Sequence, residues 1–92
     1  MTDASKQRKK DALFRLLAET TDPEDIAALL DDMCTVKEVE NMAERLFTAK
    51  LLLEGCTYNQ VMARADISSA TLSRVSRCVQ NGKGYSKLLK QN

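Results

Sequence analysis

Apolar residues recur three and four positions apart along most of this chain, which is the spacing of one face of an α-helix. The pattern predicts a first amphipathic helix over about residues 5–19 and a second helix that runs to about Met33. Asp22 is expected to cap the second helix, with Pro23 at its first helical position, a common pairing at helix starts. The sequence therefore predicts an all-α fold.

The third predicted helix has an unusually wide apolar surface. It is expected to run from a capping box of Thr35 and Glu38 to Glu54, where Gly55 ends it in the left-handed conformation. Its apolar side chains spread over roughly 200° of the circumference, about twice the stripe that a monomer's outer helix needs. They are Val36, Val39, Met42, Ala43, Leu46, Phe47, Ala49, Leu51 and Leu53. We therefore expect an intertwined homodimer; the alternative is a central helix covered by its own neighbours.

Two short helices are predicted to meet at a tight turn near Asp66. A capping box of Thr57 and Gln60 begins the first of them. Their apolar positions at helical spacing are Val61, Ala65, Leu72, Val75 and Val79. A three-residue turn between such helices commonly needs one left-handed residue, and Asp tolerates that conformation. The sequence predicts a helix-turn-helix segment over about residues 57–82, with Asp66 in the left-handed region at its corner.

The second of these helices has small and basic side chains on the side away from its apolar face. Ser68 or Ser69 is expected to cap it. Small side chains allow close approach to base edges, hydroxyls bond phosphates or bases, and arginine offers paired donors to guanine. The DNA contacts that we predict are Asn59, Ser68, Ser69, Ala70, Thr71, Ser73, Arg74 and Arg77. The alternative is an ordinary solvated face, because serine and arginine are common on surfaces.

Charge is divided unevenly, although the 92 residues carry a net charge of only +1. Residues 1–10 contain four basic residues and one acidic residue. Residues 11–54 contain four basic and eleven acidic residues, and residues 55–92 contain six basic residues and one acidic residue. An acidic middle between basic ends is typical of a chain whose ends meet a polyanion. A protein-interaction module that binds a basic partner through the acidic middle is a rival interpretation, but it leaves the basic C-terminal part unexplained.

The residue inventory disfavours several other classes of protein. The chain lacks histidine, and its three cysteines, Cys34, Cys56 and Cys78, form no C-x-x-C pair, which disfavours a metal site and a disulfide framework. We expect the three thiols to pack as small apolar groups. No apolar stretch reaches the roughly 18 residues of a membrane span, and the basic N-terminus lacks a signal-peptide core. We expect a single helical domain over residues 1–92 in the cytoplasm.

Enzyme activity is not expected from this sequence. It shows no nucleophile–base pairing at local spacing and no glycine-rich phosphate loop. Gly82 and Gly84 are interpreted as residues that end a helix. The adjacent acids Asp31 and Asp32 point in different directions on a helix, so they do not form a catalytic pair.

The stretch "LDDMCTVKEVENMAERLFTAKLLLEGCTYNQVMARADISSATLSRVSRCVQNG", residues 30–82, resembles the Trp repressor family. Within that family, "ATLSRVSRC" is similar to the "ATISRV.RC" segment of YerC/YecD-type regulators. The first helix is similar more loosely. The resemblance implies an interwoven, all-helical homodimer that presents two helix-turn-helix units to adjacent major grooves of double-stranded DNA and represses transcription.

Trp repressors use tryptophan as a corepressor, and here the match is partial. The resemblance places Arg45 and Arg74 where two arginines flank the indole, and Thr35 where a threonine lies near the ligand. Val75, however, stands where a glycine makes room for the indole, and Cys78 replaces a serine beside the ligand amino group. Overpacking such a slot costs about 1–3 kcal/mol, and a thiol is a weak hydrogen-bond partner. We expect no cofactor and no need for L-tryptophan; a tryptophan-dependent repressor is the alternative.

Overall fold

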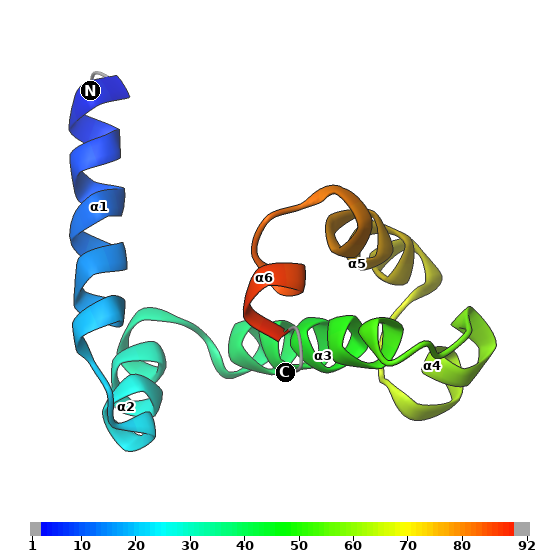
Figure 1. Cartoon of the computed structure of the whole chain (residues 1–92). Coiled ribbons are helices and arrows are strands. Elements are labelled where there is room, and N and C mark those ends of the chain that lie inside the picture. Colours follow the sequence, from blue (N-terminus) through cyan, green and yellow to red (C-terminus); the bar gives the residue numbers. More distant parts are fainter. Residues whose placement is uncertain (1–2, 90–92) are drawn as a thin grey trace. The chain divides into compact units, whose positions relative to one another are not determined.

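The computed structural model describes residues 3–89, and these form six helices and no strand. The helices are α1 (Asp3–Glu19), α2 (Pro23–Met33), α3 (Val36–Leu53), α4 (Tyr58–Arg64), α5 (Ser69–Asn81) and α6 (Tyr85–Leu89) (Figure 1). The all-α prediction is confirmed. Of the helices in this part of the chain, none is long and apolar enough to cross a membrane. The chain parts into two compact units between Val36 and Lys37, and the predicted single domain over residues 1–92 stays a prediction.

The first unit contains α1 and α2. Asp22 caps α2 as predicted, because its Oδ1 accepts a hydrogen bond from the Glu24 N–H at 2.9 Å while Pro23 takes the first helical position. At the end of α1, both the N–H and the hydroxyl of Thr20 donate to the Leu16 carbonyl, at 3.1 and 2.7 Å. Neither helix has a fully buried residue.

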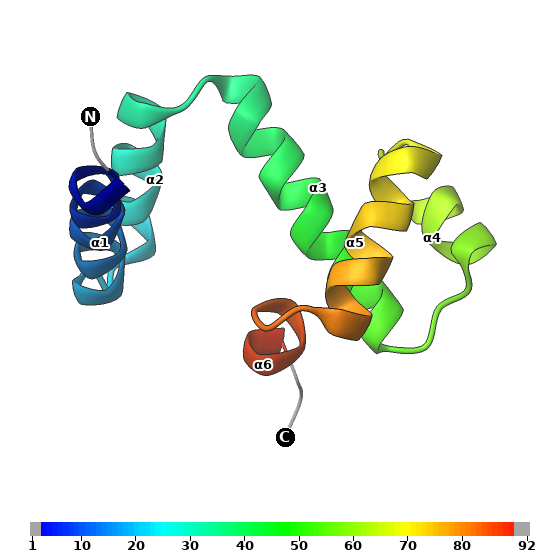
Figure 2. The ribbon, with the colours of Figure 1, turned by 90° about the horizontal axis from the view of Figure 1, so that it is seen from above.

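The core of the second unit joins three consecutive helices. Leu51 of α3, Val61 of α4 and Leu72 of α5 form one buried apolar cluster. Leu52, Cys56, Ala65 and Ile67 pack against this cluster. Figure 2 shows α5 crossing α3, with α4 and α6 on opposite sides of the crossing. The cluster therefore positions the two short helices of the helix-turn-helix segment on α3.

Gly55 ends α3 as predicted. Its φ of 96° lies in the left-handed region, where glycine is favoured because it has no Cβ. The N–H of Gly55 donates to the Leu52 carbonyl at 3.1 Å, and the N–H of Cys56 donates to the Leu51 carbonyl at 3.0 Å. This pair of bonds is a Schellman motif, which satisfies the last carbonyls of the helix and sends the chain back toward the core.

The connection between α4 and α5 differs from the predicted one. Four residues, 65–68, separate the helices instead of three, and no residue other than glycine has a positive φ within residues 3–89. The prediction that Asp66 is left-handed is therefore wrong. The physical reason is that the connection is extended at both ends, with φ and ψ of −111° and 145° at Ala65 and −73° and 158° at Ser68. An extended connection of this length joins α4 to α5 without a left-handed residue.

A short helix at the C-terminal side, α6, was not predicted. Gly82 ends α5 as expected, and its N–H donates to the Cys78 carbonyl at 2.8 Å. A Cβ at position 82 would collide with that same carbonyl, so the close approach of the two backbone segments requires glycine. Gly84 precedes α6, where the Leu88 N–H donates to the Gly84 carbonyl at 2.9 Å. The interpretation of Gly84 as a residue that ends a helix is therefore wrong, because α5 ends at Gly82 and Gly84 directly precedes α6.

Several large apolar side chains of α3 remain exposed. Leu46 is 50% exposed, and Met42, Phe47 and Leu53 are also exposed. On α6, Leu88 is 80% exposed. The apolar residues that are fully buried among those described are Ala49, Leu51, Val61, Leu72 and Val75. Helices α4, α5 and α6 thus cover only part of the wide apolar surface of α3.

Candidate nucleic-acid interface

The N-terminus of α5 is fixed by Ser68. The Oγ of Ser68 accepts a hydrogen bond from the Thr71 N–H at 3.2 Å, and the Ser68 hydroxyl donates to the Thr71 Oγ1 at 3.0 Å. Ser68 rather than Ser69 is therefore the N-cap. Both hydroxyls of this pair take part in the cap, and the Ser69 side chain remains exposed at the first helical position.

Helix α5 has one buried and one exposed face, as its pattern predicts. Leu72, Val75 and Ser76 are buried. The exposed positions among the predicted DNA contacts of this helix are Ser69, Ala70, Ser73, Arg74 and Arg77. Small side chains thus occupy the N-terminal part of the exposed face, and the two guanidinium groups follow one and two turns later. This order suits close approach of the helix start to base edges, with cations placed for phosphates or guanine.

Helix α4 begins with the predicted capping box. The Gln60 N–H donates to the Thr57 Oγ1 at 3.2 Å, and the Thr57 N–H donates to the Gln60 Oε1 at 2.8 Å. Asn59, a predicted contact, is exposed in the first turn. At the other end of α4, the guanidinium carbon of Arg64 lies 5.8 Å from the centre of the Phe47 ring on α3. This cation–π contact, which links α4 to α3, was not predicted.

A glutamate from α3 contacts the turn between α4 and α5. The backbone N–H of Asp66 donates to the Glu44 Oε1 at 3.1 Å. The two residues line a small polar cavity of about 190 Å³ whose other walls are Asn41, Arg45, Ile67, Ser68 and Thr71. Glu44 was not predicted as a site residue, because 22 positions separate it from Asp66 and no local pattern connects them.

The residues suggested for a corepressor occupy different surroundings. Val75 is only 2% exposed and belongs to the packed face of α5, as its pattern predicts. Arg45 lines the polar cavity, and Cys78 lines a second, mostly apolar cavity. Arg74 is exposed and lines neither of these two cavities. Thr35 is exposed in the first unit, directly before α3.

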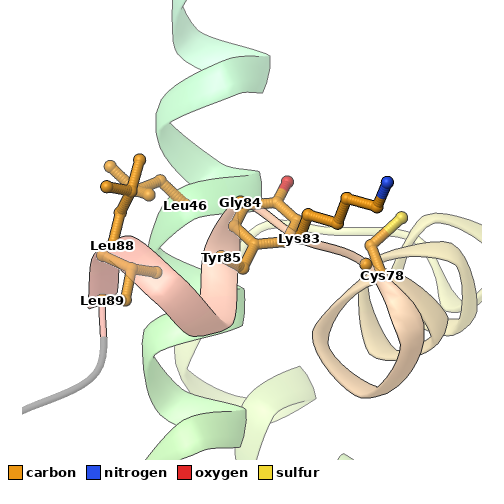
Figure 3. A pocket seen from close by; sticks show the side chains of 8 residues that line it. Leu46, Cys78, Lys83, Gly84, Tyr85, Leu88 and Leu89 are labelled. Carbon is orange, nitrogen blue, oxygen red and sulfur yellow. The ribbon is translucent and has the colours of Figure 1, made fainter.

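The apolar cavity lies between α3, α5 and α6, with a volume of about 460 Å³ (Figure 3). Its walls are Leu46, Cys78, Gly82, Lys83, Gly84, Tyr85, Leu88 and Leu89. The expectation that all three thiols are buried is wrong for Cys78, which is exposed on α5, while Cys34 and Cys56 are half-buried. On a helical wheel Cys78 lies about 60° from Val75 but about 120° from Leu72, which puts it at the edge of the buried face of α5. All three cysteines are free.

No group of three or more metal-binding side chains (His, Cys, Asp or Glu) comes together within residues 3–89. The basic residues described on α4, α5, α6 and the segment between the last two are Arg64, Arg74, Arg77, Lys83 and Lys87. Asp66 is the single acidic residue of the described part after Gly55. The exposed face of α5 therefore lies in a locally basic part of the chain.

Comparisons with known proteins agree with this arrangement. The family model described as Trp repressor protein matches residues 8–92. The chain is 36% identical over 80 residues to YerC, an uncharacterized protein of Bacillus subtilis strain 168, and the match covers 87% of this chain and 77% of YerC. The crystal structure of a candidate Trp repressor from Staphylococcus aureus matches with a TM-score of 0.85 and 32% identity, over 97% of this chain and 92% of that one. Its all-helical fold, its helix-turn-helix segment and these matches show that the chain belongs to the Trp repressor family.

Proposed function

We propose that the protein is a sequence-specific DNA-binding regulator of transcription, acting as a repressor, which places α5 in the major groove. The observation that carries the proposal is the exposed face of α5, where Ser69, Ala70 and Ser73 precede or adjoin the guanidinium groups of Arg74 and Arg77. Membership of a family of helix-turn-helix regulators supports it. The proposal implies a cytoplasmic protein, because the chromosomal DNA of bacteria, the source of both relatives, lies there.

Selection of bound sequences from a pool of random duplex DNA tests this function. The purified protein should enrich one pseudo-palindromic sequence whose half-sites lie about one helical turn, or roughly 34 Å, apart. Enrichment should weaken as salt is raised, because phosphate contacts release counterions. A pool that stays unenriched at low salt would contradict DNA reading.

The regulator is proposed to act as a homodimer. Support comes from the exposed apolar side chains of α3 and from the apolar cavity, to which Leu46 of α3 and Leu88 of α6 both contribute. Soluble monomeric proteins rarely expose large apolar patches, and such a patch usually marks a surface that a partner covers. Two copies would carry two α5 helices, which matches the two half-sites that dimeric helix-turn-helix proteins read.

Arg74 is proposed to contact DNA, although the family resemblance also places it beside a corepressor. Replacement by alanine should weaken DNA binding without any added tryptophan. If the guanidinium meets a phosphate, the slope of log affinity against log salt should become shallower by about one unit. Affinities measured by fluorescence anisotropy over a range of salt concentrations check this. Lys50→Ala on α3, which also removes one exposed cation, is the control; equal affinities and slopes for wild type and Arg74→Ala would remove Arg74 from the interface.

DNA binding is proposed to be independent of tryptophan. Val75 is buried on the packed face of α5. This burial supports the interpretation that its isopropyl group fills the space that the indole ring of tryptophan would need. Titration with L-tryptophan should therefore give no binding heat and no gain in DNA affinity. A ligand that binds preferentially to the DNA-competent form must raise the apparent affinity of the protein for DNA. A tryptophan-dependent increase in affinity, measured by calorimetry and anisotropy on the same preparation, would overturn this part of the proposal.

A further inference from the structure

We propose that Glu44 of α3 is a positioning residue for DNA reading. By accepting a hydrogen bond from the backbone of Asp66, it holds the turn between α4 and α5 so that the N-terminus of α5 meets the bases in one orientation. The inference rests on the proposed DNA binding by α5. It concerns a residue that is not itself assigned to the DNA surface.

The Asp66 N–H has no partner in either flanking helix. The last N–H bonded along α4 is that of Ala65, which donates to the Val61 carbonyl at 2.8 Å. On the other side, the first N–H bonds of α5 converge on Ser68, whose Oγ and carbonyl accept from Thr71 and Leu72. Asp66 lies between these two systems, and its N–H donates to the Glu44 Oε1 at 3.1 Å. A side-chain oxygen at this place is an acceptor of suitable geometry for the backbone N–H.

The next residue provides a second anchor of a different kind. Ile67 packs against the cluster of Leu51, Val61 and Leu72. An apolar contact of this sort is non-directional, so it holds the turn close to the core without fixing its direction. The hydrogen bond to Glu44 is directional and supplies that missing constraint. Together the two successive residues define both the distance and the orientation of the turn.

The position of Glu44 on α3 gives this bond its functional meaning. Leu46, on the proposed dimer surface, lies two residues further along the same helix. The bond therefore fixes the start of α5 relative to α3. In the proposed dimer, α3 would also set the distance between the two subunits. Reading bases needs that fixed geometry, whereas non-specific binding needs mainly positive charge. Loss of the bond should reduce discrimination between sequences more than it reduces general affinity for DNA.

Three variants separate the acceptor from the charge. Glu44→Ala removes both, Glu44→Gln removes the charge but keeps an Oε1 acceptor, and Glu40→Ala removes an equal charge from an exposed position one turn earlier on α3. In the free protein, hydrogen exchange of the Asp66 amide, measured by NMR, should be roughly five- to tenfold faster in Glu44→Ala. The Glu44→Gln and Glu40→Ala variants should retain the wild-type protection. Unchanged protection in Glu44→Ala would overturn the proposal.

DNA discrimination provides the readout that a merely structural role would not change. The measured quantity is the ratio of affinities for the duplex selected by the wild-type protein and for a scrambled duplex of the same composition, at a temperature where every variant is folded. The ratio should fall about tenfold in Glu44→Ala, which is the size expected for one well-oriented base contact. It should stay at the wild-type value in Glu44→Gln and Glu40→Ala.

The outcomes also separate this inference from the proposed function. A wild-type protein that binds no duplex overturns DNA reading and the positioning role together. A wild-type protein that discriminates between the duplexes, with a Glu44→Ala variant that keeps the same ratio, overturns the positioning role alone. Equal losses of the ratio in Glu44→Gln and Glu44→Ala would assign the effect to charge and also overturn the hydrogen-bond role.

Discussion

Truncation of Leu72 to alanine is expected to lower the free energy of unfolding by about 2–5 kcal/mol. Leu72 is 1% exposed and forms the buried cluster with Leu51 and Val61, so it links α5 to both α3 and α4. Removing its side chain loses apolar contacts and leaves a cavity among three helices. Because small domains are only marginally stable, a loss of this size approaches the whole stability of the fold. Urea unfolding followed by circular dichroism measures it.

Met62→Ala is the matched control for this prediction. Met62 neighbours Val61 in sequence but is 43% exposed, because it lies about 100° further around α4. Its truncation should change the free energy of unfolding by no more than about 0.5 kcal/mol. If both variants lose the same stability, the described core does not account for the fold.

Leu46→Glu is expected to raise the dissociation constant of the proposed homodimer by at least about 100-fold, because an unpaired carboxylate in an apolar interface costs about 3 kcal/mol or more. Wild-type protein should be dimeric at micromolar concentration, and its melting temperature should rise with protein concentration. The variant should sediment as a monomer over the same range. It should also lose most of its affinity for the selected duplex, since only a dimer reads two half-sites at once.

Lys37→Glu is the control for an added glutamate on α3. Position 37 lies nine residues before Leu46, which places it about 180° away around the helix. Its side chain is exposed, and we expect the variant to remain dimeric. A wild-type protein that sediments as a monomer at tens of micromolar, with melting independent of concentration, would contradict the homodimer.

Most helix ends could be predicted because they depend on local chemistry. Asp22 and Thr57 cap α2 and α4 through hydrogen bonds to residues two or three positions away. Gly55 ends α3 because the left-handed region favours a residue without a Cβ. The faces of α5 follow from its 3.6-residue period in the same way, and Val75 lies on the packed face as predicted. In each case the sequence within about one helical turn determines the result.

The turn and the last helix could not be predicted because their determinants are distant or weak. The geometry around Asp66 depends on Glu44, which comes from another helix. Tyr85–Leu89 is a five-residue helix, too short for a periodic pattern and preceded by Gly82 and Gly84. Cys78 was expected in the core as a small apolar residue, but it lies at the edge of the buried face of α5 and is exposed. The candidate DNA contacts were predicted from local patterns around α4 and α5, whereas the residue proposed to orient α5 has no such local pattern.

The core of the second unit is made by residues that lie close together in the chain. Leu51, Val61 and Leu72 belong to three consecutive helices and fall within residues 51–72. Folds with such short sequence separation between contacts form in microseconds to milliseconds, whereas subunit association is slower and depends on concentration. A newly synthesised chain would therefore have its reading helix in place before it meets a second copy. The rate of synthesis sets the concentration of subunits and therefore how often two of them meet. It would thus determine how soon the proposed DNA-binding dimer forms in the cell.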